Sequence, residues 1–286
     1  MKPFLPISWR AWILAGLAGL ALPETPRAYP PAPDHVFYGV VRDEMGYPLT
    51  SSTAVIILET AAGVQIKTTI SPNVEPGVNY RLAVPMDAGI TDDAYKPTAL
   101  RPTVPFKIKV QVGSTVYVPV EMKADFSKMG QPGQRTRMNL TLGEDANGDG
   151  LPDAWERALL ATYGLGKDLS NIHSTNRLNG SSLTLEQQYV AGTYAYDSRD
   201  GFTLKALRAD AEMARLEFMA VQGRTYTVYG SADCQAWVNV PFRLAEQGDA
   251  ASLVTDYYAA DIRVIQVDVP LPSTPPAVRF FKLMVQ

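Results

Sequence analysis

The sequence predicts a mainly β fold in which two β-sandwich (Ig-like) domains are joined by a short helical segment. Residues 35–143 and 200–286 consist of short apolar or alternating runs separated by Gly, Pro and Asn clusters, a pattern typical of many short strands joined by turns. Between them, residues 144–199 place apolar side chains at helical spacing in two short stretches. A chain of 286 residues is long enough for two such domains.

The N-terminus has the features of a secretory signal peptide. Lys2 and Arg10 bracket a charged region, and residues 11–22 form an apolar run that is too short to span a bilayer comfortably. Small residues favour cleavage after Ala21, with Ala28 as another candidate position and an uncleaved anchor as the alternative. We therefore expect a signal peptide at 1–21, a Pro-rich linker at 22–34, and a protein that is secreted or held at the cell surface.

The residues that follow the predicted linker, 35–143, have a sequence pattern that predicts a β-sandwich. Its expected strands are residues 36–41, 54–59, 64–70, 80–84, 106–112 and 115–121. The opening Tyr38-Gly-Val-Val-Arg-Asp-Glu-Met-Gly-Tyr-Pro-Leu49 resembles the start of carboxypeptidase-regulatory-like sandwich modules, and this implies a hairpin turn at residues 43–46. Some such modules carry a Lys to Asn isopeptide bond. Lys107, Lys109 and Asn139 lie on candidate strands, but ordinary surface positions are favoured for them.

Residues 145–156, Asp-Ala-Asn-Gly-Asp-Gly-Leu-Pro-Asp-Ala-Trp-Glu, match the EF-hand calcium pattern. Calcium takes six to eight oxygen ligands, and the sixth loop position, Gly150, allows the sharp turn that brings them together. The alternative is an acidic surface turn without metal, in which four carboxylates this close would repel one another. The expected ligands are the side chains of Asp145, Asn147 and Asp149, the carbonyl of Leu151, Asp153 through a water molecule, and both carboxylate oxygens of Glu156.

The flanks of this loop differ from those of a paired EF-hand. Residues 135–142 alternate like a strand, whereas Trp155, Leu159 and Tyr163 recur at helical spacing, so the order is strand, loop, helix. Pro152 lacks the N–H that a partner loop would use, which argues against a calmodulin-like sensor. The stretch instead resembles the calcium loops of dockerin and thrombospondin type 3 repeats in secreted bacterial proteins.

That resemblance implies a second loop followed by a second helix. The helix is represented by Leu185, Tyr189 and Val190, with Gly192 as its stop. The preceding residues 176–182 contain no carboxylate, and calcium prefers charged ligands. We therefore expect a metal at the first loop only and a metal-free turn at the second.

Residues 200–286 predict a second β-sandwich. Its expected strands are residues 215–221, 225–229, 237–240, 253–257, 264–269 and 280–285. Residues 223–237 and the closing run 279–285 resemble the fibronectin type III-like terminal modules of exported bacterial proteins. In those modules a leucine commonly follows the aspartate, so we expect Cys234 to be a small buried core residue rather than a reactive thiol.

Charge and cysteine content narrow the possible partners. Loss of the first 21 residues lowers the Lys plus Arg count from 26 to 24 against 29 Asp plus Glu, a net charge of −5 that makes nucleic acid an improbable partner. No later apolar run approaches membrane-spanning length. The single cysteine cannot form a disulfide within the chain, and calcium is a sensible substitute because it adds stability by binding only the folded state.

No catalytic motif accompanies the calcium loop. The histidines His35 and His173 lie apart, and the chain lacks the nucleophile, zinc-hydrolase and phosphate-loop signatures. The adjacent pair Asp92 and Asp93 is better explained as a solvated turn. We expect no catalytic residues and no enzymatic activity, and a hydrolase with two distant carboxylates is the remaining enzyme hypothesis.

The sequence therefore predicts an exported calcium-binding protein with a structural or interaction role, in which calcium rigidifies the interdomain segment. Its expected partner besides calcium is a surface protein or a polysaccharide. The alternative is a carbohydrate-binding module whose aromatic side chains stack on sugars. Candidates for that stacking are Tyr194, Tyr196, Tyr257 and Tyr258, although core or scattered surface positions are favoured for them.

Overall fold

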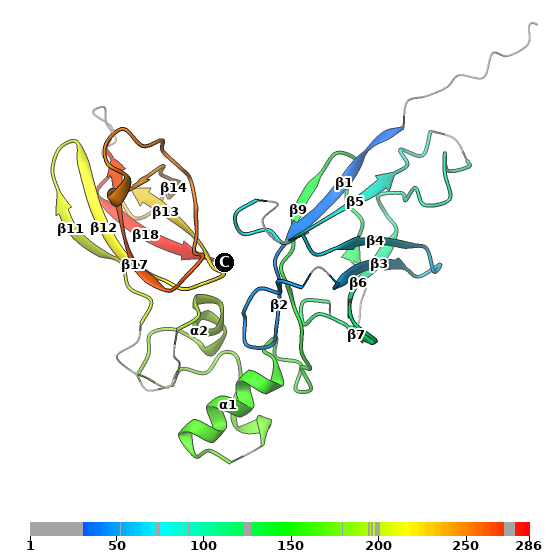
Figure 1. Cartoon of the computed structure of the whole chain (residues 1–286), viewed down its shortest axis with the longest axis horizontal. Coiled ribbons are helices and arrows are strands. Elements are labelled where there is room, and N and C mark those ends of the chain that lie inside the picture. The colour runs from blue at the N-terminus through cyan, green and yellow to red at the C-terminus, as the bar shows by residue number, and fades with distance from the viewer. Residues whose placement is uncertain are drawn as a thin grey trace, which may run out of the picture. The chain divides into compact units, whose positions relative to one another are not determined.

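The computed structural model describes residues 31–286 except 52, 72–74, 91, 123–126, 167, 179, 194, 196, 198–200 and 272–277 (Figure 1). The chain divides into Met1–Pro31 and a compact unit, Ala32–Gln286, to which the description below applies. The predicted signal peptide and residues 22–30 of the predicted linker lie outside the described residues. Within them, strands predominate over two α-helices, so the predicted mainly β fold is confirmed.

The strands that precede the loop at 145–156 form three sheets. The sheet orders are β5-β1-β9, β4-β3-β6-β7 with β8 on β6, and the pair β10-β2. β1 runs parallel to β9 and β2 runs parallel to β10, while the other pairs are antiparallel. The strands are β1 Ala32–Gly39, β2 Val41–Arg42, β3 Val55–Thr60, β4 Gln65–Thr69, β5 Tyr80–Met86, β6 Pro105–Val112, β7 Thr115–Tyr117, β8 Ser127–Lys128, β9 Arg135–Arg137 and β10 Leu140–Thr141.

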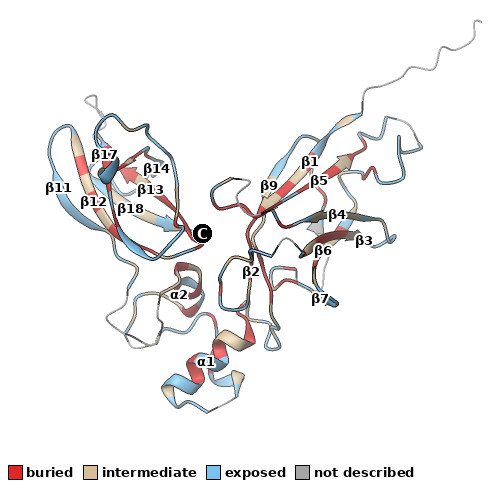
Figure 2. Cartoon of the chain, in the orientation of Figure 1, coloured by how far each residue is buried: buried red, intermediate tan, exposed pale blue. Residues whose placement is uncertain are grey.

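These sheets share one hydrophobic core because their strands alternate in burial (Figure 2). In β5, Tyr80 and Leu82 are buried while Arg81 between them is exposed, and in β6 Phe106 and Ile108 face the same core. Most predicted strands are found within a few residues of their expected bounds. The run at 135–142 is broken into β9 and β10, and at the break the side chain of Asn139 accepts a hydrogen bond from the Val40 amide.

Two α-helices follow, α1 at Asp153–Tyr163 and α2 at Leu185–Ala191, with a 3-10 turn at Leu169–Asn171 between them. Both α-helices end at a glycine in the left-handed conformation, as predicted for Gly192. α2 begins with a capping box between Thr184 and Gln187. Their apolar faces form a separate core cluster, whose buried members are Leu151, Leu159, Leu160, Ile172, Leu185, Tyr189 and Ala195.

The C-terminal strands form two further sheets around a core of their own. The sheet orders are β11-β12-β17-β15 and β14-β13-β16, with β18 paired to β13. The prediction placed no strand at β11, which is exposed at every position. The elements are β11 Lys205–Ala209, β12 Met213–Ala220, β13 Thr225–Ser231, β14 Val238–Asn239, β15 Arg243–Leu244, the 3-10 turn Ala245–Gln247, β16 Tyr257–Tyr258, β17 Arg263–Pro270 and β18 Phe280–Val285.

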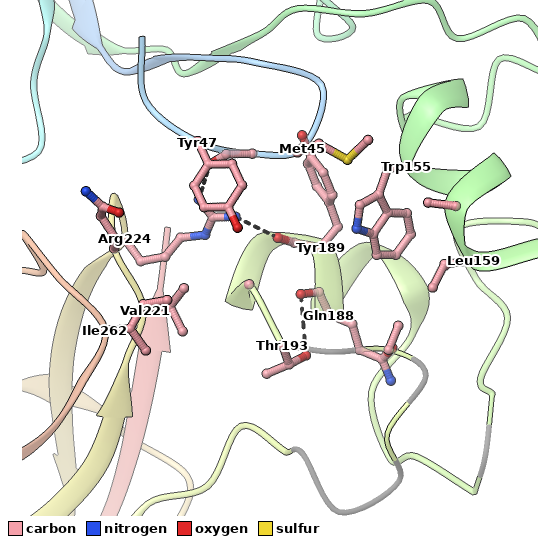
Figure 3. A pocket seen from close by; sticks show the side chains of 15 residues that line it. Met45, Tyr47, Trp155, Leu159, Gln188, Tyr189, Thr193, Val221, Arg224 and Ile262 are labelled. Atoms are coloured by element: carbon pink, nitrogen blue, oxygen red, sulfur yellow. Dashed lines mark hydrogen bonds between the residues drawn. The ribbon is translucent and has the colours of Figure 1, made fainter. Parts of the chain in front are cut away.

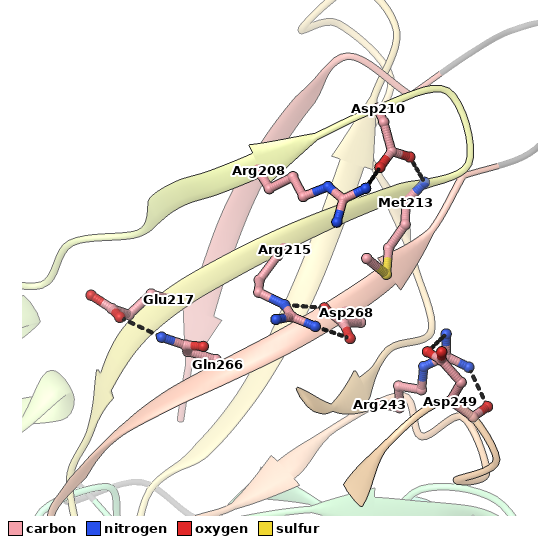
Figure 4. A network of polar contacts seen from close by, with 9 residues as sticks. All are labelled: Arg208, Asp210, Met213, Arg215, Glu217, Arg243, Asp249, Gln266 and Asp268. Carbon is pink, nitrogen blue, oxygen red and sulfur yellow. Dashed lines mark hydrogen bonds and ion pairs between the residues drawn. The ribbon is translucent and has the colours of Figure 1, made fainter. Parts of the chain in front are cut away.

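The face of the β11-β12-β17-β15 sheet that points away from this core carries paired polar side chains (Figure 4). Arg215 on β12 donates two hydrogen bonds, of 2.7 and 2.9 Å, to the buried carboxylate of Asp268 on β17. One step along the ladder, Gln266 donates to Glu217 at 3.0 Å. These cross-strand pairs stabilise the register of β12 against β17.

One sequence-based expectation about a single residue is not met. Cys234 is exposed rather than buried, and it lies in a loop with a φ of 63°. Trp237, three residues later, donates its indole N–H to the Cys234 carbonyl, so the loop closes through the backbone rather than through the thiol. Two of the isopeptide candidates have other partners, because Lys109 pairs with Glu59 and Asn139 accepts a hydrogen bond from the backbone of Val40.

Candidate metal centre

The loop at 145–156 folds around the carboxylate of its first residue. The Asp145 side chain accepts hydrogen bonds from the backbone amides of Asp149 and Gly150, both at 3.0 Å. Gly150 has a φ of 95°, which a residue with a Cβ rarely adopts, so the glycine expected at the sixth position performs the sharp turn. The carboxylate at position one is thereby fixed inside the turn.

The third and fifth positions also face the interior of the loop. Asn147 accepts from the Asp149 amide at 3.2 Å and donates its side-chain N–H groups toward both carboxylate oxygens of Glu156, at 3.3 and 3.2 Å. Asp149 accepts from the Leu151 amide at 2.9 Å. Each carboxylate oxygen offers more than one lone pair, so these bonds leave acceptor capacity on Asp145 and Asp149.

Asp153, the ninth position, is engaged by protein groups on both oxygens. One oxygen accepts from the Ala146 amide and the other from Arg157, each at 2.8 Å. The side chain is buried, and its own amide donates to the Glu144 carbonyl at 2.8 Å. Asp153 therefore ties the start of the loop to the first turn of α1, a role that its spacing in the sequence did not indicate.

Glu156, the twelfth position, is fully buried. Burial raises its pKa from the ordinary 4.5 to about 7, and the nearby charges of Asp149, Asp153 and Asp145 act in the same direction, while the hydrogen bond from Asn147 opposes them. A carboxylate held in such a place is costly to ionise unless a cation lies beside it. The crowding of acids around Glu156 is the electrostatic feature expected of a cation loop.

The loop thus brings together the side chains of Asp145, Asn147, Asp149 and Glu156, while the Leu151 side chain enters the core of the helical segment. In the described part of the chain, no group of three or more His, Cys, Asp or Glu side chains is arranged to hold a metal ion. Four members of the expected ligand set, Asp145, Asp149, Asp153 and Glu156, are carboxylates, and the structure does not arrange three of them as a formed metal site. The set also includes the amide of Asn147 and the carbonyl of Leu151. Oxygen donors of these mixed types are those that calcium prefers.

Ser174, just before the predicted second turn, contacts the loop directly. The Ser174 amide donates to the second oxygen of Asp149 at 2.5 Å, and the Ser174 carbonyl accepts from the Glu186 amide at 3.0 Å. Glu186 lies in the first turn of α2. Ser174 therefore links the fifth position of the loop to the second helix, a contact that no sequence spacing signals.

Beyond α2, Arg224 joins three segments of the chain. Its guanidinium, which is 3% exposed, donates to the carbonyls of Val190 at 2.6 Å, Tyr189 at 3.0 Å and Gly46 at 2.5 Å. These carbonyls belong to the C-terminal end of α2 and to the hairpin turn after β2. One buried cation thus connects the N-terminal sheets, the helical segment and the C-terminal sheets.

Glycines allow the close approach around Arg224. A Cβ added at Gly46 would lie 2.6 Å from the Arg224 guanidinium, and one at Gly223 would lie 2.4 Å from the ring of Pro48. At Gly77 it would meet the Thr225 hydroxyl at 2.5 Å. Such distances are shorter than van der Waals contact, so these segments pack tightly against one another.

No family model matches the sequence, and neither the curated proteins nor the solved structures searched include a similar protein.

The remaining candidate residues lie outside the loop. His35 is buried and its Nε2 contacts the Thr136 hydroxyl at 2.9 Å, whereas His173 is exposed. Tyr257 and Tyr258 are half-buried on β16, and the Tyr257 hydroxyl accepts from Arg263 at 3.3 Å. Tyr194 and Tyr196 lie outside the described residues. Among the described helices, none has the length and apolarity needed to cross a membrane.

Proposed function

We propose that this chain is an exported calcium-binding protein with a structural or interaction role at the cell surface or outside the cell. Calcium would bind the loop at 145–156 and rigidify the segment 144–199, which we take to join two Ig-like β-sandwich domains, 35–143 and 200–286. The dockerin- and thrombospondin type 3-like sequence of the loop and the separate core on each side support this organisation.

The observation that carries the proposal is a continuous set of hydrogen bonds from the loop to both flanking regions. It runs from Asp149 through Ser174 into α2, and from the last carbonyls of α2 to Arg224. Arg224 then reaches Gly46 in the N-terminal region. A cation that orders the loop would thereby order the segments that α2 and Arg224 hold.

The acidic interior of the loop supplies the energetic reason. Without a cation, ionised Glu156 lies buried among Asp145, Asp149 and Asp153, and this destabilises the folded chain at neutral pH. A ligand that binds only the folded state adds about 2.7 kcal/mol at a concentration one hundred times its Kd. For an exported chain with one exposed cysteine and no possible internal disulfide, calcium is a suitable source of that stability.

Thermal unfolding in a calcium titration tests the proposal. We expect the Tm to rise with calcium and the rise to be lost in Asp149→Ala, which removes an acidic side chain from the loop interior. Asp34→Ala is the matched control because Asp34 is exposed on β1 and lies outside the loop. A Tm that is unchanged by calcium, or a rise of equal size in both variants, would refute calcium binding at this loop.

A carbohydrate-binding role is the second candidate function. It is favoured by a cavity with aromatic walls beside α1 and α2, lined by Tyr47, Trp155 and Tyr189 among others. Binding of a sugar there is compatible with the structural role, because the same helices carry the proposed calcium loop.

A further inference from the structure

A cavity of about 240 Å³ opens where α1, α2, the turn after β2 and the loops of the C-terminal sheets meet (Figure 3). Its volume is below the usual range for sites that hold drug-sized ligands, so it suits a single ring rather than a long chain. The lining includes no aspartate and no glutamate, and Arg224 is its one charged residue among those described. The cavity therefore has the opposite electrostatic character from the acidic loop at 145–156.

Arg224 retains hydrogen-bonding capacity at this site. Its side chain carries five N–H donors, and the bonds to Val190, Tyr189 and Gly46 use three of them. Burial lowers the pKa of the guanidinium, while nearby groups, Asp43 among them, act in the opposite direction. The hydrogen-bond acceptors of Arg224 among the described residues are neutral carbonyls. A buried cation that is hydrogen-bonded only to carbonyls favours an anionic ligand, and arginine binds carboxylates especially well.

Aromatic rings form one wall of the cavity. Trp155 and Tyr189 pack edge to face with ring centroids 5.3 Å apart, and Tyr47 also lines the cavity. Tyr47 and Ile262 lie at the rim, where their side chains are 50% and 60% exposed. Flat rings of this kind bind the apolar face of a ring-shaped ligand while leaving polar groups at its edge free.

Amide and hydroxyl side chains complete the lining. Gln188, Gln222 and Thr193 all border the cavity. The side-chain oxygen of Gln188 is buried and has no hydrogen-bond partner among the described residues. A buried acceptor in this state is destabilising, and a ligand hydroxyl could donate to it after a rotation of the amide.

From these features we propose that the cavity binds a sugar ring that carries a carboxylate, as in a uronic acid. The carboxylate faces Arg224, the C–H face of the ring lies on the aromatic wall, and the hydroxyls meet the amides. The ligand site shares α1 with the loop, since Trp155 lines the cavity and Glu156 belongs to the loop. Because of this shared helix, the inference rests on the proposed calcium binding. Calcium and the uronic acid should then raise each other's affinity for the chain.

Isothermal titration of the exported chain with galacturonate, and with galactose as the neutral match, tests the ligand class. We expect galacturonate to bind at least about tenfold more tightly than galactose at low salt, with the difference reduced at high salt. Equal affinities for the two sugars, or no binding of either, would overturn the proposal.

Rim variants locate the site without disturbing Arg224. Tyr47→Ala should weaken galacturonate binding, whereas Tyr95→Ala, at a tyrosine that is 47% exposed and does not line the cavity, should not. Ile262→Glu should weaken galacturonate more than galactose because it adds a negative charge at the rim, with Leu253→Glu as the control. A loss of binding that is the same for cavity and control variants would place the site elsewhere and contradict the proposal.

The same titration with calcium in excess and with a chelator separates this inference from the proposed function. Tighter galacturonate binding in calcium supports the coupling through α1. Calcium-dependent stabilisation without galacturonate binding would overturn the inference and leave the calcium proposal standing. Galacturonate binding that ignores calcium, in a chain that calcium does stabilise, would refute the coupling.

Discussion

Replacing Glu156 with glutamine separates two effects of this side chain. One is the free-energy cost of burying its charge, and the other is its contribution to calcium binding. In the folded chain without metal, the pKa of Glu156 is raised from 4.5 to about 7, chiefly by burial. One pKa unit corresponds to about 1.4 kcal/mol, so ionised Glu156 destabilises the metal-free fold by about 3 kcal/mol. Glutamine has the same shape and no charge, and this cost disappears in Glu156→Gln.

The pH dependence has a defined sign. Because the folded pKa is higher than the unfolded one, the folded chain binds more protons between pH 4.5 and about 7. The free energy of unfolding therefore falls as pH rises through this window, and the contribution of Glu156 is fully lost above about pH 7. In chelator we expect Glu156→Gln to be more stable than the wild type at about pH 8 and to lose this part of the pH dependence.

Calcium should reverse which protein is more stable, the wild type or Glu156→Gln. With calcium present, the carboxylate of wild-type Glu156 becomes a calcium ligand. The glutamine variant lacks this charged ligand, so it should be the less stable protein. Urea unfolding at about pH 8, with and without calcium, measures both differences. Glu186→Gln, at an exposed glutamate on α2, is the control and should change little in either condition. If Glu156→Gln is destabilised equally with chelator and with calcium, the side chain is only a structural acceptor and the reasoning fails.

Three further predictions concern Gly223, Arg224 and His35. Gly223→Ala should lower the Tm more than Gly63→Ala, because the two glycines have φ values of 80° and 81° but only Gly223 has a neighbour within 4 Å of an added Cβ. Arg224→Gln should lower the free energy of unfolding by about 3 kcal/mol in urea titrations, since it leaves buried carbonyls without a donor, and Arg208→Gln on exposed β11 is the comparison. Burial lowers the pKa of His35 below 6.5, so in calcium the wild type should lose stability as pH falls through that value and His35→Gln should flatten the curve.

Local patterns predicted much of the secondary structure because they reflect local physics. Alternation at 80–84 and 106–112 anticipated β5 and β6, and β18 matches its expected bounds at residues 280–285. The helix after the loop was predicted from its apolar spacing, and Gly150 from the turn that the loop requires. β11 was missed because its side chains are exposed on every position, so burial imposes no pattern on it.

Within the loop, spacing predicted which side chains would face inward but not which partners they would find. Asp153 was expected to act through water, yet its two oxygens are held by the Ala146 amide and by Arg157. The sequence contains both partners, but nothing in it ranks an ion pair four residues away above a bound water. The predicted burial of Cys234 was wrong for a related reason. The residue lies in a turn with a positive φ, and this local conformation decides its exposure more than its apolar type does.

Arg224 could not have been identified from the sequence, because its acceptors are backbone carbonyls that carry no side-chain signature. Gly46 lies 178 residues away in the chain, and the contact exists only because glycines at Gly46 and Gly223 let the segments approach. Arg224 is hydrogen-bonded to carbonyls rather than to a carboxylate, so its charge can attract an anion at the cavity beside it. The same residue therefore supports two proposals: it connects the segments that calcium would rigidify, and it gives the adjoining cavity its preference for an anion. These proposals can be separated because calcium acts at Glu156, whereas the anion acts at Arg224.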